Sequence, residues 1–260
     1  MRDIIIPVDF SETSLNAVRY ATKMLSGKAN ARVILYNMFK DEEEATTATQ
    51  YLESLKAEME ESGVSNIEII KELGSDLIDN LSRLAYQKTA EMIVMGITEK
   101  DEWRQFFMGS NTVKMAEEGI CPVMIIPPAA KFNGINNVSL ASDFKDVDAT
   151  PVLAIKTVLG IFNANLHIVN VDNEHYVALT EEYLTERAKM QQMFAEFNPE
   201  FYFIGMNDFY EAVDQFSRDK NIDLLIVVPK NHTFMNSLFS SSHTKKLAFN
   251  SSVPLLAVHQ

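Results

Sequence analysis

The chain repeats itself, and this internal repeat constrains its fold more than any other feature of the sequence. NNVSLASDF resembles the opening DIIIPVDF, so that Asp143 corresponds to Asp9. SSVPLLAVHQ closes the second half as GICPVMIIPP closes the first, and between those ends DLLIVVP corresponds to AEMIVMG. Two copies of about 130 residues, a usual size for a domain, are therefore expected at 1–130 and 136–260, joined by a short linker.

Each copy alternates short runs of β-branched residues with longer amphipathic segments. In the first half, DIIIPVDF is followed by SETSLNAVRYATKML and then by ARVILYNM. Further along, Leu77, Leu81 and Leu84 fall on one face at helical spacing, and Ser75 is placed to cap that helix. This alternation predicts an α/β fold in which each copy is a five-stranded parallel sheet with helices on both faces.

The charge and the apolar pattern argue against several classes of partner. Lys and Arg total 23 against 36 Asp and Glu, and the resulting net charge of −13 repels nucleic acid phosphates and anionic lipids. No apolar run reaches the length of a membrane span, and MRDIIIPVDF lacks the pattern of a signal peptide. The single cysteine, Cys121, excludes an intramolecular disulfide framework. We therefore expect a soluble cytoplasmic protein with no nucleic acid and no membrane as partner.

The candidate ligand site lies at the ends of two predicted strands. In an open parallel sheet, ligands bind beyond the carboxyl ends of the strands, at the point where the strand order reverses. Asp9 directly follows the first predicted strand, and Gly96 ends the fourth. These two residues flank a crevice if the first and fourth strands are neighbours.

The stretch MGITEKDEWRQFFMGSNT, residues 95–112, connects the fourth strand to a helix that begins near Ser110. Free backbone N–H groups at a helix start, glycines that permit close approach and hydroxyl donors all favour the binding of phosphate. The alternative is that Ser110 caps the helix and that Gly96 only makes a turn. The local chemistry leaves both interpretations open.

Three motifs together resemble the universal stress protein family: PVDFSETSLNA at the start, the loop from Gly96 to Ser110, and CPV at the beginning of the last strand. The resemblance covers both halves and implies a tandem form of that family, with strand order 3-2-1-4-5 in each sheet. This order places strands one and four side by side. It also implies a stress-response protein that binds ATP, AMP or another adenine nucleotide, with Mg²⁺ as a candidate companion ion.

The resemblance assigns the site to the first half of the chain. Pro7 and Asp9 match the strand-one residues that lie beside the adenosine, and Gly96, Gly109 and Ser110 match the phosphate loop. The full candidate set is Pro7, Asp9, Met95, Gly96, Gly109, Ser110, Asn111 and Thr112.

Glu99 departs from the ATP-binding pattern, because it occupies the position of the family's second loop glycine. A carboxylate about 4 Å from a phosphate charge is unfavourable by roughly 1 kcal/mol in full solvent, and by several times that in a partly dry cleft. Adenosine, AMP or a magnesium-bridged nucleotide is therefore favoured over a free triphosphate.

The second copy departs further from the family pattern. Ala141 replaces Pro7, the alignment places Pro229 where the first copy has Gly96, and two serines replace the glycine and serine of the loop. Proline has no N–H to offer a ligand and lacks the conformational freedom of glycine. We expect this half not to bind ATP in the manner of the family.

A ligand-free interaction module is the alternative function. In that interpretation the two halves pair across their last strands, as dimers of the family do, and an unidentified protein or a second chain binds the pair. The sequence has no Ser-His-Asp arrangement, no paired-carboxylate signature and no Walker lysine motif, so weak ATP hydrolysis is the most that we expect of it as an enzyme. The histidines His232, His243 and His259 match no metal signature.

Overall fold

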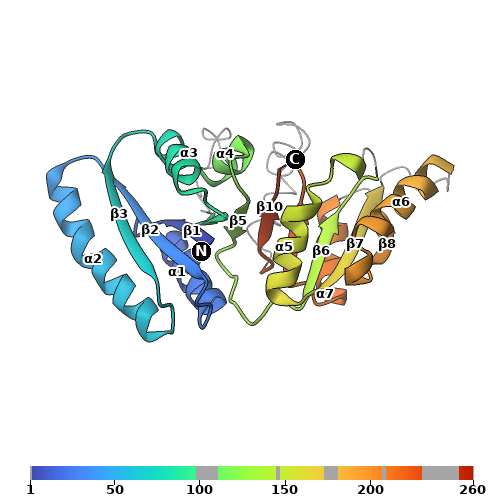
Figure 1. Cartoon of the computed structure of the whole chain (residues 1–260), viewed down its shortest axis with the longest axis horizontal. Coiled ribbons are helices and arrows are strands. Elements are labelled where there is room, and N and C mark those ends of the chain that lie inside the picture. Colours follow the sequence, from blue (N-terminus) through green and yellow to red (C-terminus); the bar gives the residue numbers. More distant parts are fainter. Residues whose placement is uncertain are drawn as a thin grey trace. The chain divides into compact units, whose positions relative to one another are not determined.

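The computed structural model describes residues 2–97, 111–144, 147–172, 181–206, 209–229 and 252–259 of the chain. The chain divides into two compact units, Met1–Phe132 and Asn133–Gln260. Each unit contains its own run of parallel strands and its own helices (Figure 1).

The first unit is a five-stranded parallel sheet of order β3-β2-β1-β4-β5. Its strands are β1 (Arg2–Pro7), β2 (Ala31–Phe39), β3 (Ile67–Leu73), β4 (Met92–Gly96) and β5 (Val123–Ile126). Its helices are α1 (Glu12–Leu25), α2 (Glu42–Glu61), α3 (Leu77–Lys88) and α4 (Asn111–Glu118). The α/β fold with strand order 3-2-1-4-5 is thus confirmed.

Helices cover both faces of this sheet. Because crossover connections between parallel strands are right-handed, α1 and α2 lie on one face, whereas α3 and α4, which contact each other, lie on the other. The central strands are accordingly apolar on both sides: Ile5 and Ile6 of β1 and Ile93 and Val94 of β4 are fully buried. These continuous apolar runs form the core and hold the ends of β1 and β4 in place.

The cap of α3 differs from the sequence-based prediction by one residue. Ser75 was predicted to cap the helix, but Asp76 is the N-cap and accepts hydrogen bonds from the N–H groups of Ile78 (3.0 Å) and Asp79 (3.1 Å). An aspartate carboxylate is a good N-cap acceptor, and the positive end of the helix dipole favours its charge. The adjacent carboxylate therefore takes the place predicted for the serine.

The second unit has the same topology. Its strands are β6 (Asn137–Ala141), β7 (Asn165–Asp172), β8 (Glu200–Gly205), β9 (Leu224–Val227) and β10 (Leu255–Ala257), in the order β8-β7-β6-β9-β10. Its helices are α5 (Val152–Phe162), α6 (Glu181–Met193) and α7 (Phe209–Asp219), with short 3-10 turns η1 (Val147–Ala149) and η2 (Ala195–Phe197). Counted along this unit, the order is again 3-2-1-4-5.

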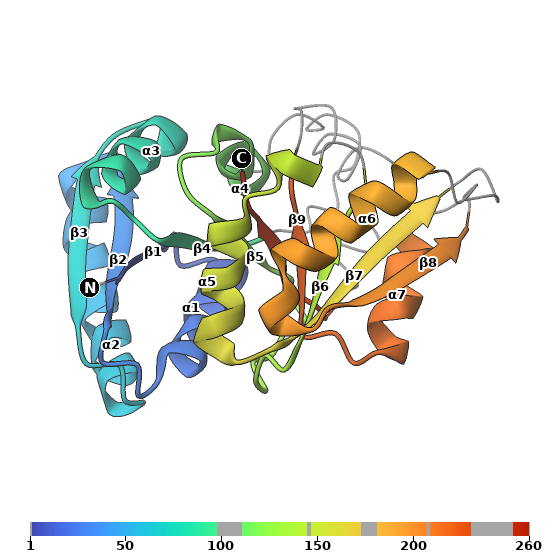
Figure 2. The same ribbon diagram turned by 45° about the vertical axis from the view of Figure 1, so that its right-hand side comes forward.

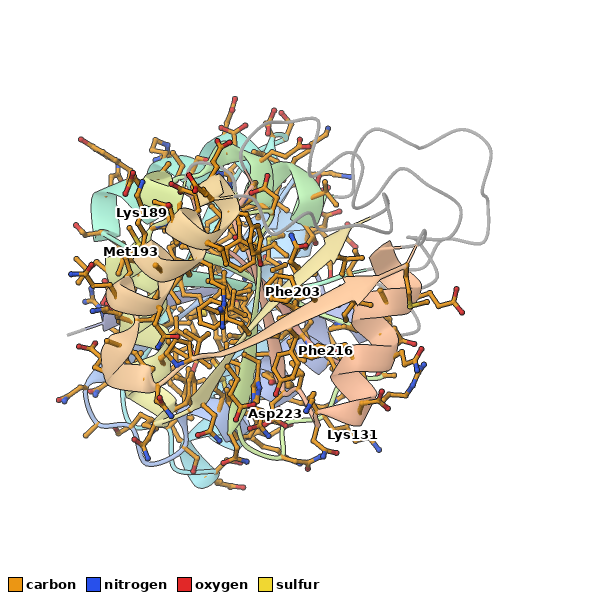
Figure 3. The ribbon with its side chains drawn as sticks, turned by 90° about the vertical axis from the view of Figure 1, so that its right-hand side faces the viewer. Lys131, Lys189, Met193, Phe203, Phe216 and Asp223 are labelled. Atoms are coloured by element: carbon orange, nitrogen blue, oxygen red, sulfur yellow. The ribbon has the colours of Figure 1, made fainter. Side chains whose placement is uncertain are left out.

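Helices also lie on both sides of the second sheet (Figure 2). Figure 3 shows Lys189 and Met193 of α6 on one side of β8 and Phe216 of α7 on the other. Phe216 packs with Val169 and neighbouring side chains to form the core beneath α7. Within the described ranges, no helix has both the length and the apolar character needed to cross a bilayer.

His167 of β7 is expected to make the stability of the second unit depend on pH. The side chain is buried, with Nδ1 3.6 Å from Glu200 Oε2 and Nε2 3.4 Å from Asn137 Oδ1. Burial lowers the pKa of His167 below its usual value and Lys220 lowers it further, although Glu200 acts in the opposite direction. The unfolded chain therefore binds this proton more readily, and the free energy of unfolding should fall as the pH drops below about 6.5.

Urea unfolding at about pH 7.5 and about pH 5.5 tests this prediction. The variant His167→Gln has no titrating ring, so it should lose less stability between the two pH values than the wild type does. An equal loss in the two proteins would contradict the assignment to His167.

Candidate functional site

Strands β1 and β4 lie side by side, so their carboxyl ends form one edge of the first sheet. Ile4, near the middle of β1, pairs with Met92, the first residue of β4, and Ile5 pairs with Ile93. Pro7 and Met95, at the ends of the two strands, are buried, whereas Asp9, just beyond β1, is exposed. The adjacency on which the predicted crevice depends is therefore present, and Asp9 is the predicted residue that reaches solvent from β1.

Asp9 forms a tight turn between β1 and α1. Its Oδ1 accepts hydrogen bonds from the N–H of Ser11 (3.0 Å) and from the Ser11 hydroxyl (2.5 Å). Ser11 is also the N-cap of α1, where its Oγ accepts from the N–H of Ser14. Burial raises the pKa of Asp9, but hydrogen bonds from Ser11 and Ser14 outweigh it and hold that pKa below its ordinary value. Asp9 is thus a carboxylate at neutral pH, fixed in orientation by the first turn of α1.

The turn after this aspartate has the same backbone form in both units. Phe10 has a φ of 62° and Phe144 a φ of 51°, in the left-handed region that residues other than glycine seldom adopt. The ring of Phe10 packs against Tyr51 of α2 with centroids 5.4 Å apart, and Phe144 packs against Tyr183 of α6 at 5.2 Å. A repeated aromatic pair therefore stabilises the turn.

Gly96, at the end of β4, lies against the start of α1. A Cβ at this position would lie 2.2 Å from the carbonyl oxygen of Thr13 and 2.6 Å from its carbonyl carbon. Side-chain carbons do not approach backbone atoms so closely, so α1 packs on β4 in this way only because residue 96 has no side chain. The glycine has a structural role here, whatever the following loop binds.

Helix α4 is fixed to the same edge of the sheet. Thr112, in its first turn, is buried, and its Oγ1 donates a hydrogen bond of 2.8 Å to the carbonyl of Gly96. The Thr112 hydroxyl therefore anchors α4 to the end of β4, while Asn111, the first residue of the helix, is exposed. The other predicted loop residues, Gly109 and Ser110, lie outside the described residues, as does Glu99.

Asn37 was not among the predicted site residues, yet it contacts the turn that carries Asp9. It lies in β2, is only 6% exposed, and its Nδ2 donates a hydrogen bond of 2.8 Å to the carbonyl of Val8. Its Oδ1 is buried without a hydrogen-bond partner among the described residues. The sequence offers one signal for such a role, namely a polar residue directly after the apolar run VILY.

The pairing register corrects one correspondence between the two copies. Ile4 pairs with Met92 in the first sheet, and Val138 pairs with Leu224 in the second. Counted forward from these pairs, the equivalent of Gly96 is Val228. The sequence alignment that placed Pro229 there was wrong by one residue, because runs of apolar residues match one another at more than one offset.

A valine at this position changes where the first helix of the second unit can start. Helix α1 begins at Glu12, three residues after Asp9, whereas α5 begins at Val152, nine residues after Asp143. Val228 has the Cβ that Gly96 lacks, so a helix start placed as in the first unit would collide with it. The second unit therefore lacks the close helix–strand contact that shapes the predicted site.

Neither a reactive thiol nor a metal centre is indicated by the described side chains. Cys121 is buried, and burial raises its pKa to about 12, so it is a protonated thiol at neutral pH. No three His, Cys, Asp or Glu side chains in the described ranges are grouped so that they could hold a metal ion.

Comparison with known proteins gives one family match and several structural ones. Residues 1–127 match the model of the universal stress protein family. The whole chain resembles a universal stress protein from Archaeoglobus fulgidus DSM 4304 at 15% identity, with a TM-score of 0.74 over 99% of this chain and 96% of that one. No curated protein matches the sequence.

Two further structures have a similar tandem fold. One is a functionally unknown protein from Pseudomonas aeruginosa PAO1, at 11% identity and a TM-score of 0.64 over 100% of this chain and 92% of that one. The other is the cytoplasmic domain of a prokaryotic cation chloride cotransporter, at 10% identity and a TM-score of 0.57 over 98% and 94% of the two chains. At these identities the likeness shows a common fold, and function has to be argued from the site.

Proposed function

Because residues 1–127 belong to the universal stress protein family, we propose a function in two parts. The first unit binds an adenine nucleotide at the edge formed by β1 and β4, and the protein acts in a cytoplasmic stress response. The observation that carries this proposal is the position of Asp9, a carboxylate that Ser11 holds at the carboxyl end of β1, beside β4. The binding residues would be Pro7, Asp9, Met95, Gly96, Gly109, Ser110, Asn111 and Thr112.

The chemistry of Asp9 suits the nucleoside end of such a ligand. Both hydrogen bonds from Ser11 go to Oδ1, and a carboxylate has about four acceptor sites, so the group can still accept from a ribose hydroxyl or an amino group. A carboxylate would repel a phosphate, so the phosphates would lie toward the start of α4. There, the backbone N–H groups and the positive dipole end of the helix favour an anion.

Glu99 is expected to decide how many phosphates the site accepts. The variant Glu99→Gly removes the loop carboxylate and should strengthen binding of ATP by about fivefold or more, which corresponds to about 1 kcal/mol or more. AMP, which carries a single phosphate, should gain less. Calorimetric titration with ATP, ADP and AMP in the presence of Mg²⁺ measures both effects.

Asp101→Gly is the matched control, since it removes a carboxylate from the same loop at a position with no counterpart in the family pattern. An equal gain in ATP affinity from both variants would show a general charge effect and contradict the specific role of Glu99. Removal of Mg²⁺ with a chelator tests whether Glu99 and the phosphates bind the same ion. If they do, chelation should weaken ATP binding more in the wild type than in Glu99→Gly.

A ligand-free interaction module is the second candidate, and one observation favours it for the second unit. Val228 and the late start of α5 remove the close helix–strand contact found in the first unit. In this role the second unit would pair with the first across their last strands, and the pair would bind a protein partner or a second chain. Native mass spectrometry of the purified protein distinguishes the two functions, because a bound nucleotide adds its mass to that of the chain.

A further inference from the structure

Two asparagines occupy equivalent positions in the two units. Asn37 of β2 donates through Nδ2 to the carbonyl of Val8 at 2.8 Å, and Asn170 of β7 donates through Nδ2 to the carbonyl of Ser142 at 2.9 Å. Both asparagines are buried, at 6% and 7% exposure. Each accepting carbonyl belongs to the residue directly before the Asp-Phe pair that occurs in both copies of the repeat. The same amide therefore holds the same peptide group in both units.

In the first unit this peptide group joins Val8 to Asp9. The N–H of Val8 donates to the carbonyl of Tyr36 at 2.8 Å, and its carbonyl accepts from Asn37, so β2 holds Val8 on both sides. Rotation of the peptide before Asp9 would break the hydrogen bond to Asn37. The direction in which the chain leaves β1 thus depends on Asn37, whose side chain donates to the Val8 carbonyl and not to the Asp9 carboxylate.

The other end of the Asn37 amide is unusual for a protein core. Oδ1 is buried and has no hydrogen-bond partner among the described residues. A buried acceptor without a partner costs about 1–3 kcal/mol, so an apolar residue of similar shape would relieve this cost in a position that served packing alone. Packing alone therefore does not explain the Asn37 amide, whereas its hydrogen bond to the Val8 carbonyl, next to Asp9, does.

We propose that Asn37 is a positioning residue of the nucleotide site, which fixes the peptide between Val8 and Asp9 and thereby directs the Asp9 carboxylate toward the ligand. The identity of the ligand rests on the proposed function, whereas the effect on Asp9 does not. Asn170 provides a matched control within the same chain, because it makes the same hydrogen bond in the unit that is not expected to bind nucleotide.

The test compares Asn37→Leu with Asn170→Leu in the full chain. Leucine is similar in size to asparagine, and its side chain makes no hydrogen bonds. NMR of ¹³C-labelled carboxyl groups follows the titration of Asp9, and calorimetry measures the affinity for AMP. We expect Asn37→Leu to raise the pKa of Asp9 toward its ordinary value, because the Ser11 hydrogen bonds are then less well aligned, and to weaken AMP binding by about tenfold or more. Asn170→Leu should change neither quantity.

The outcomes separate the two proposals. If Asp9 titrates as in the wild type when Asn37 is leucine, or shifts equally when Asn170 is leucine, the positioning role is overturned. If Asp9 shifts as expected but the wild-type protein binds no adenine nucleotide, the positioning role stands and the proposed function fails. Should Asn37→Leu not fold, Asn37→Ser, which adds no bulk and keeps a polar group, is measured in the same way and must raise the pKa of Asp9 to support the proposal.

Discussion

Replacing Gly96 with alanine is expected to lower the free energy of unfolding by about 3 kcal/mol. The new Cβ would lie 2.2 Å from the Thr13 carbonyl oxygen and 2.6 Å from its carbonyl carbon. Both atoms belong to the backbone of α1, so no side-chain rotation can make room, and either the helix or the end of β4 has to move. Overpacking of a well-packed interior costs about 1–3 kcal/mol, and a clash with helix backbone belongs at the upper end of that range.

Gly160→Ala is the matched control for this substitution. Gly160 lies within α5, and a Cβ built there meets no atom within 4 Å. Because alanine has a higher helix propensity than glycine, this variant should gain roughly 0.5–1 kcal/mol. Urea unfolding followed by far-ultraviolet circular dichroism measures both variants. A loss of stability below about 1 kcal/mol for Gly96→Ala would show that α1 does not pack so closely on β4.

Replacing Arg32 with leucine is expected to destabilise the first unit by a similar amount. Asp3 of β1 is only 4% exposed, and its two carboxylate oxygens accept hydrogen bonds from Nε and Nη2 of Arg32 on β2. Removal of one partner of a buried ion pair leaves an uncompensated charge, which costs about 3–5 kcal/mol. The Arg32 side chain is partly solvated, so water reaches the pair, and the lower end of that range, about 3 kcal/mol, is expected.

The second unit shows how this loss can be recovered. Asp3 pairs with Arg32 across the strands of the first unit, and Asn137 pairs with Asn165 at the same register in the second. There the two amides make a neutral hydrogen bond of 3.1 Å. The double variant Asp3→Asn/Arg32→Asn should therefore be more stable than Arg32→Leu in the same urea experiment. The double variant contains no buried unpaired charge. If it is no more stable than Arg32→Leu, this explanation is contradicted.

The fold could be predicted from the sequence because its signals are long and repeated. Fully apolar strands such as those around Ile5 and Ile93, separated by amphipathic helices, occur twice along the chain, and few folds other than a parallel α/β sheet accommodate that pattern. The order of the strands was not contained in this alternation. It came from the resemblance to the universal stress protein family and is confirmed by the strand pairing.

The finer features of the site depend on contacts that are not encoded in local sequence. The role of Asn37 follows from its hydrogen bond to Val8, which lies 29 residues away in the sequence. The clash at Gly96 involves Thr13 of α1, near the start of the chain. The correspondence of Val228 with Gly96 required the register of paired strands. The resemblance predicted that β1 and β4 are neighbours, which the strand pairing confirms, whereas the contacts of individual residues at the ends of these strands required the structure.

The most direct test of the central claim is calorimetric titration of AMP and of ATP with Mg²⁺ into the full chain and into the variants Asp9→Ala and Asp143→Ala. These two aspartates occupy equivalent places in the two units, so the comparison assigns binding to one unit. We predict one saturable site per chain, weakened by about tenfold or more in Asp9→Ala and unchanged in Asp143→Ala. Absence of saturable binding in the wild type, or an equal loss in both variants, would contradict a nucleotide site in the first unit.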